Sequence, residues 1–186
     1  MADLAAVRIP WSNVITLSRL IAAPFFFCAL LGDSPVVAFV LFWLAVLTDV
    51  ADGRLARARG EATAFGGLLD HATDASFVAL ALSALALQGI VPAVLPVLVL
   101  LAFVQYVLDS KSLAGRVLRA SALGRWNGIL YFVPPGIVVT RPMLGLEVPG
   151  DELVHLIGVA LAVSSGLSMA DRAWTLLRAR RDDARG

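Results

Sequence analysis

Cysteine and charge are both scarce in this sequence. One cysteine, Cys28, stands among 186 residues, which excludes an internal disulfide and a thiolate metal cage. Charged residues make up 16% of the chain, against about 25% in ordinary soluble domains. The formal net charge is +1, so nothing indicates a nucleic-acid partner. Internal repeats and low-complexity segments are also absent, which argues against a repeat array or a disordered chain.

Hydrophobic residues are abundant instead, at 59%. A helix that crosses a membrane needs about 20 mostly apolar residues. Six segments of this kind are present, and Pro134-Pro135 should kink the fifth. The sequence therefore predicts an all-α, integral membrane bundle of six transmembrane helices, folded as a single domain over residues 1–186. The segments are 14–31, 35–47 with a polar extension toward 59, 65–87, 91–108, 123–140 and 152–176.

The ends of the chain and its basic residues predict an orientation. Residues 1–12 read as a short interfacial lead-in, with Trp11 at the level of the headgroups. A cleavable signal peptide is not expected, because a basic lead is missing and Arg19 interrupts the apolar stretch. Lys and Arg gather in the loops after the second and fourth segments and in the tail, 177–186. The positive-inside rule then puts both termini on the cytoplasmic side, as an even number of spans requires, in a bacterial inner membrane.

Four aspartates stand where the second segment ends and the third begins. Asp49 and Asp52 are three residues apart, and Asp70 and Asp74 are four apart. On helices, both spacings place the two side chains of a pair on one face. Because the two helices are consecutive and antiparallel, the pairs fall at the same depth. Four carboxylates are therefore expected to converge on one site.

Such a cluster needs a compensating positive charge. An intramembrane Asp costs about 2.5–3.5 kcal/mol on the gentler insertion scale, and neighbouring carboxylates repel one another. An all-oxygen ligand set selects Mg²⁺ or Mn²⁺, and the carboxylates suffice for two ions, an arrangement used in phosphoryl displacement. Two alternatives remain open from the residues alone. The acids could pair with nearby arginines and only hold helices together, or they could line the cation or proton path of a small transporter.

The spacing of these residues resembles the signature of the CDP-alcohol phosphotransferase (CDP-alcohol phosphatidyltransferase) family. Eight fixed positions match, with both long spacings intact. The stretch Asn13-x-x-Thr16-x-x-Arg19 is similar to the one that opens many members. The signature is Asp49-x-x-Asp52-Gly53-x-x-Ala56-Arg57, eight residues, then Gly66-x-x-x-Asp70-x-x-x-Asp74.

The resemblance implies a fold, a reaction and roles for residues. Members are six-helix membrane enzymes, commonly homodimers, that move a phosphatidyl or related group from a CDP-linked donor to a hydroxyl and release CMP. The implied donor here is CDP-diacylglycerol. The implied metal ligands are Asp49, Asp52, Asp70 and Asp74, with Asp74 also the general base. The implied donor-binding residues are Gly53, Arg57, Thr63, Asn13 and Thr16.

The acceptor alcohol is less well defined by the sequence. Arg116, Arg119 and Arg125 lie on the same predicted membrane side as the carboxylates and could bind an acceptor phosphate. The stretch 121–125 is similar to one in phosphatidylglycerophosphate synthases and cardiolipin synthases, but the chain then departs from it at 126–128. Glycerol 3-phosphate is the first expectation. Phosphatidylglycerol and inositol phosphate are alternatives, as is a catalytically silent member of the family.

Overall fold

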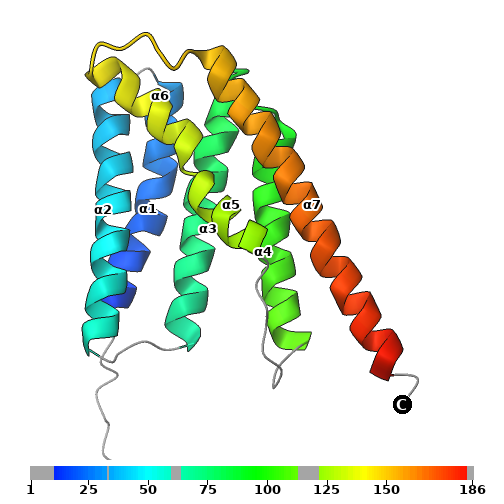
Figure 1. Ribbon diagram of the computed structural model, residues 1–186. Coiled ribbons are helices and arrows are strands. Elements are labelled where there is room, and N and C mark those ends of the chain that lie inside the picture. Colours follow the sequence, from blue (N-terminus) through cyan, green and yellow to red (C-terminus); the bar gives the residue numbers. More distant parts are fainter. Residues whose placement is uncertain (1–10, 33, 60–63, 113–121, 184–186) are drawn as a thin grey trace, which may run out of the picture.

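The computed structural model describes residues 11–32, 34–59, 64–112 and 122–183, and these ranges contain helices and turns but no strand. The all-α class predicted from the sequence is confirmed. Figure 1 shows the helices packed side by side as a bundle. They are α1 (Trp11–Leu31), α2 (Pro35–Arg59), α3 (Ala64–Leu87), α4 (Val94–Ser112), α5 (Ala122–Leu130), α6 (Val133–Met143) and α7 (Asp151–Asp183).

The fifth predicted segment is broken into two helices. Pro134 and Pro135 lie in the first turn of α6, where a missing amide hydrogen is tolerated. Neither proline can donate to the carbonyl four residues earlier, so the hydrogen-bond ladder of α5 stops. The chain turns at Tyr131 and Phe132, and α6 leaves in a new direction. Figure 1 shows α5 and α6 running obliquely across the other helices, so the expected kink is a complete break.

Membrane-spanning character is clearest in two helices. Among the described residues, Gly66–Leu87 and Asp151–Thr175, with 22 and 25 residues, are long and apolar enough to cross a bilayer. Three further apolar segments are shorter: Ile15–Leu31, Pro35–Ala51 and Val94–Leu108. Large apolar side chains are exposed on all of these helices; Phe25, for example, is 63% exposed. An exposed apolar surface of this extent is typical of a protein surrounded by lipid.

Two buried clusters hold the bundle together, and α3 belongs to both. In the first, the rings of Phe26 and Phe77 stack with centroids 5.1 Å apart and planes 4° from parallel, and Phe42 of α2 packs against Phe26 at 5.9 Å. The second joins α3 to α4 and α7 through Leu82, Leu85, Leu95, Val99, Val154 and Leu161. The acidic residues of α3 therefore belong to a helix that packs against α1 and α2 in one cluster and against α4 and α7 in the other.

A glycine sets the distance between α7 and the turn that joins α3 to α4. A Cβ atom on Gly158 would lie 2.9 Å from Pro92 Cδ and 3.2 Å from Val91 Cβ, so any larger residue must push the two elements apart. At Gly166, two turns further along α7, a Cβ would meet nothing within 4 Å. Only the first of these glycines is required for close packing.

Candidate active site

Three of the four aspartates meet between α2 and α3. One carboxylate oxygen from each of Asp49, Asp70 and Asp74 lies within 4.8 Å of the other two. The side chains are 41%, 41% and 26% exposed, so all three are partly withdrawn from solvent. The four-residue spacing places Asp70 and Asp74 on one face of α3, and that face is turned toward Arg19 of α1 and the Asp49 carboxylate of α2.

Arg19 of α1 lies at the centre of this acidic cluster. Its Nη1 donates to Asp49 Oδ1 at 2.5 Å and to Asp74 Oδ1 at 2.6 Å, while Nη2 donates to Asp70 Oδ1 at 2.5 Å. The Arg19 side chain is 4% exposed. A guanidinium offers several donors in a fixed plane, which allows one residue to serve three carboxylates. Arg19 thereby joins α1 to both helices that carry the acidic motif.

The acidic cluster also suits a divalent cation. Its donor atoms are carboxylate oxygens, which Mg²⁺ and Mn²⁺ prefer. The three carboxylate oxygens lie within 4.8 Å of one another. Two oxygens on opposite sides of one Mg²⁺ are about 4.2 Å apart, for bonds of about 2.1 Å, so the spacing is close to that of a metal site. Arg19 donates to Oδ1 of each residue, and each carboxylate also carries Oδ2. The residues present therefore fit a metal.

A cavity of about 680 Å³ opens beside the acidic cluster. Asp49, Asp74 and Arg19 belong to its wall. Most of the remaining lining is apolar, with Phe77, Val99 and similar residues from α2 to α7. A volume in the range of about 300–1,000 Å³ and a largely apolar wall with few polar groups are typical of sites for small molecules.

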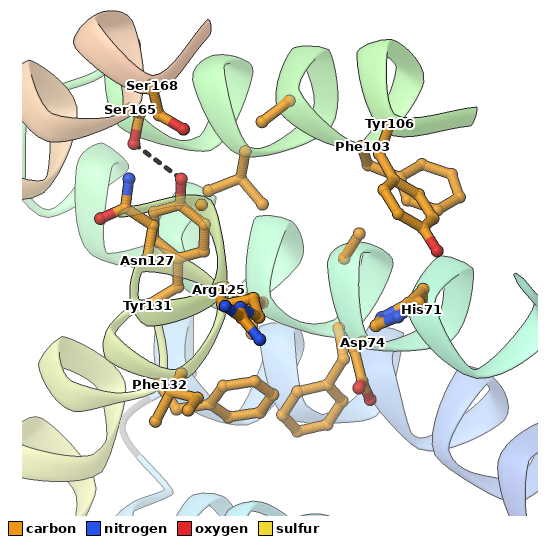
Figure 2. A pocket seen from close by; sticks show the side chains of 18 of the residues that line it. His71, Asp74, Phe103, Tyr106, Arg125, Asn127, Tyr131, Phe132, Ser165 and Ser168 are labelled. Atoms are coloured by element: carbon orange, nitrogen blue, oxygen red, sulfur yellow. Dashed lines mark hydrogen bonds between the residues drawn. The ribbon is translucent and has the colours of Figure 1, made fainter. Parts of the chain in front are cut away.

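Polar side chains close the cavity where α5 meets α7 (Figure 2). Ser164 donates to Asn127 Oδ1 at 2.7 Å. Ser165 donates its one hydroxyl proton to the Leu161 carbonyl, so Tyr131 is the donor in its 2.6 Å bond to Ser165. These bonds tie the short α5 and the turn that follows it to α7. They also fix α5 in the position from which Arg125 lines the cavity.

A cation and two rings line the cavity between α3, α4 and α7. The ring of Tyr106 on α4 meets His71 of α3 edge to face, with centroids 5.3 Å apart, and Figure 2 shows the pair on the same side as Asp74. The Arg172 guanidinium lies 5.8 Å from the centroid of the Tyr106 ring, within the range of a cation–π interaction. Arg172 and Arg125 thus add two positive charges to the cavity wall.

The remaining sequence-predicted residues have different outcomes. Thr16 is buried in α1, three residues before Arg19. Asn13, Asp52, Gly53 and Arg57 belong to helices, but their side chains lie outside the described part. Thr63, Arg116 and Arg119 lie outside the described residues altogether.

Several residues of the cavity carried no site role in the sequence analysis, among them Arg19, Arg172 and Gln105. Arg19 had a detectable signal, because a charged residue inside an apolar segment is expensive and marks function or pairing. Arg172 looked like one more basic residue near the C-terminal tail. Gln105, in the middle of an apolar helix, had only its polarity as a signal. Their positions depend on how the helices pack, which a single sequence does not define.

An acidic, oxygen-only cluster that could hold a metal ion, beside a cavity in an apolar helical bundle, is typical of a membrane-associated enzyme. Comparison with known proteins is more specific. The family model described as CDP-alcohol phosphatidyltransferase matches residues 10–167. This chain therefore belongs to the CDP-alcohol phosphatidyltransferase family, as the motif predicted.

Several curated proteins are similar to this chain. A probable phosphatidylglycerophosphate synthase of Mycobacterium tuberculosis is 30% identical over 177 residues, covering 87% of this chain and 80% of the relative. CDP-diacylglycerol–glycerol-3-phosphate 3-phosphatidyltransferases of Salmonella paratyphi A and Escherichia coli are 39% and 40% identical over 73 residues. Each of these matches covers 38% of this chain and 40% of the relative.

Proposed function

We propose that this protein transfers a phosphatidyl group from CDP-diacylglycerol to glycerol 3-phosphate and releases CMP. The observation that carries the proposal is the meeting of Asp49, Asp70 and Asp74 beside a cavity, at the spacings of the family motif. The names of the similar proteins favour glycerol 3-phosphate over phosphatidylglycerol or inositol phosphate.

The acidic cluster would serve the donor side of the reaction. Asp49, Asp52, Asp70 and Asp74 would hold divalent ions, two in our proposal and Mg²⁺ or Mn²⁺ by ligand chemistry. When bound, such ions neutralise diphosphate charge and stabilise the leaving group. Arg19 keeps the carboxylates together and reduces their mutual repulsion. The proposed donor-binding residues around this centre are Gly53, Arg57, Thr63, Asn13 and Thr16.

The bond changes follow from the two substrates. The acceptor hydroxyl oxygen forms a bond to the β-phosphorus of the CDP-lipid, and the bond from that phosphorus to the bridging oxygen breaks. CMP leaves with the bridging oxygen. The hydroxyl proton passes to Asp74, which we assign as the general base and as the group that orients the hydroxyl.

Basic residues would bind the phosphate of the acceptor. Arg125 and Arg172 line the cavity, and guanidinium groups suit phosphate because they donate two parallel hydrogen bonds. Arg116 and Arg119 complete the set proposed from the sequence. Since the acceptor also carries its reacting hydroxyl to Asp74, it would lie across the cavity from α7 toward α3.

The arrangement in the membrane is part of the same proposal. The Lys and Arg distribution supports both termini and the active site on the cytoplasmic side of a bacterial inner membrane. The five apolar helices or helical segments and the broken α5–α6 pair would together form six spans of a single domain, residues 1–186. Residues 1–12 would lie at the interface and 177–186 in the cytoplasm. We further propose a homodimer, as is common in the family.

The decisive experiment measures CMP release by the purified protein in lipid vesicles or detergent. With CDP-diacylglycerol and Mg²⁺ or Mn²⁺, we expect turnover that depends on glycerol 3-phosphate and stops in excess EDTA. Phosphatidylglycerol and inositol phosphate are tested in parallel. Turnover with one of these alone would reassign the acceptor. Absence of metal-dependent CMP release with all three would overturn the proposed chemistry and favour a transporter or a silent family member.

A further inference from the structure

Gln105 of α4 has only half of its amide group satisfied. Its Nε2 donates to the Met169 carbonyl of α7 at 3.1 Å. Its Oε1 is buried and has no hydrogen-bond partner among the described residues. Gln105 also lines the cavity that holds the acidic cluster. A buried oxygen without a hydrogen-bond partner destabilises the fold, so an atom of this kind in the wall of a substrate cavity calls for an explanation.

The orientation of this amide is set by its partner. A backbone carbonyl can only accept a hydrogen bond, so the nitrogen of Gln105 must face Met169 and the oxygen must point elsewhere. Exchanging the two atoms would bring two acceptors together and lose the 3.1 Å bond. The oxygen is thus held as an acceptor, and it needs a donor that the described side chains do not supply.

The neighbours of Gln105 connect it with the acceptor side of the cavity. The next residue, Tyr106, carries the Arg172 guanidinium over its ring. Met169, which binds the Gln105 amide, lies three residues before Arg172 and so on the same face of α7. Gln105 is therefore bonded to α7 about one helical turn before Arg172. Asp74 belongs to the same cavity, on α3.

We propose that Gln105 Oε1 accepts a hydrogen bond from the acceptor alcohol, at a hydroxyl group other than the one that reacts. This inference rests on the proposed function. A molecule whose phosphate is held at Arg172 and whose reacting hydroxyl reaches Asp74 carries its middle portion past α4. In glycerol 3-phosphate, that portion bears the secondary hydroxyl. Acceptor binding would have to turn the Gln105 amide so that its oxygen faces this hydroxyl. Gln105 then determines specificity without taking part in the chemistry.

The test compares two acceptors in three proteins. Glycerol 3-phosphate and 3-hydroxypropyl phosphate share the phosphate and the primary hydroxyl, but only the first has the middle hydroxyl. With the wild type we expect kcat/KM to favour glycerol 3-phosphate by about 10- to 100-fold. Gln105→Met keeps the length of the side chain and removes its polar atoms, and should use both acceptors about equally. Gln105→Glu keeps an acceptor oxygen and should retain part of the preference. KM for CDP-diacylglycerol should not change.

Gln88 supplies the matched control. It lies in the turn after α3 and also donates from its amide to a helical backbone carbonyl, that of Leu30 at 2.7 Å, but it does not belong to the cavity wall. Gln88→Met should leave the acceptor preference at the wild-type value. If Gln105→Met does not fold, Gln105→Asn replaces it. This variant draws the oxygen back by one methylene and should likewise reduce the preference for glycerol 3-phosphate.

The outcomes separate this inference from the proposed function. A wild-type protein without glycerol 3-phosphate turnover would overturn the proposed function before any variant is compared. A wild type that treats both acceptors alike would overturn the role of Gln105, as would a Gln105→Met variant that keeps the wild-type preference. In either case the amide would serve only to bridge α4 and α7 or to hold a water molecule.

Discussion

The guanidinium of Arg19 lies 2.6 Å from the carboxylate of Asp74, and the same nitrogen serves Asp49. With Asp70 included, three negative charges and one positive charge leave this acidic cluster with a formal charge of −2. That remainder equals the charge of one divalent cation in magnitude. Arg19 and a metal would therefore each neutralise part of the carboxylate charge. Arg19 can be removed by substitution and the metal by EDTA, so the two contributions can be tested separately.

Replacing either motif aspartate of α3 should stop the reaction. Asp70→Asn and Asp74→Asn keep the side-chain volume but remove a charge and an oxygen ligand, so CMP release should fall by at least about 100-fold. Detergent-solubilised yield and helix content should stay at the wild-type level. Glu152→Gln, an exposed acid in the first turn of α7, is the control and should remain active. Wild-type turnover in both aspartate variants would contradict the assignment.

Removing Arg19 should make the fold depend on a metal. Arg19→Met leaves three carboxylates without their shared partner, which should lower the free energy of unfolding in EDTA by about 3 kcal/mol or more. Millimolar Mg²⁺ should recover part of this loss, and thermal unfolding in detergent measures both. The control is Arg141→Met. Arg141 pairs with Asp151, whose side chain is 57% exposed, so the loss there should be about 1 kcal/mol or less. Equal losses in unfolding free energy for the two variants would show that Arg19 stabilises the acidic cluster no more than an exposed ion pair would.

The hydrogen bond between Tyr131 and Ser165 should contribute measurably to stability. Tyr131→Phe removes the donor of a buried 2.6 Å bond and should cost about 1–2 kcal/mol. Ser165→Ala should cost a similar amount, and the double variant little more than either one, because both remove the same bond. Unfolding midpoints in detergent test this. Strictly additive losses would mean that the two hydroxyls do not interact.

Two glycines of α7 should respond in opposite ways to alanine. Gly158→Ala places a methyl group 2.9 Å from Pro92 Cδ and should destabilise the protein by about 1–3 kcal/mol through overpacking. Gly166→Ala meets nothing within 4 Å and should be neutral or stabilising by up to about 1 kcal/mol, because alanine favours the helix. Thermal unfolding of the pair gives the comparison. A neutral Gly158→Ala would show that α7 is free to move away from the α3–α4 turn.

The acidic motif was predictable because its geometry is mostly local. The spacing of Asp70 and Asp74 fixes a shared helix face, and the short connection between α2 and α3 brings Asp49 to the same depth. The role of Arg19 was not predictable in this way. It depends on the rotation of α1 about its own axis and on its packing against α3, and these are properties of the whole bundle.

The fifth segment shows a second limit of the sequence pattern. Pro134-Pro135 predicted a local disturbance, and the structure places a full break there, with α5 and α6 as separate helices. Hydrophobicity alone does not separate one bent helix from two short ones. What decides is how the residues on each side of the break pack, and here side-chain hydrogen bonds tie Asn127 of α5 to Ser164 and Tyr131 of the turn to Ser165.

The position of Arg19 also bears on how such a protein comes to be assembled. Because Arg19 already supplies a positive charge to the acidic cluster, no ion is required when the helices insert into the bilayer and pack against one another. Membrane insertion and ion binding can then be separate events. The insertion machinery controls the first, and the concentration of the ion in the cell controls the second. A chelated enzyme should accordingly remain intact and regain its activity once the ion is returned.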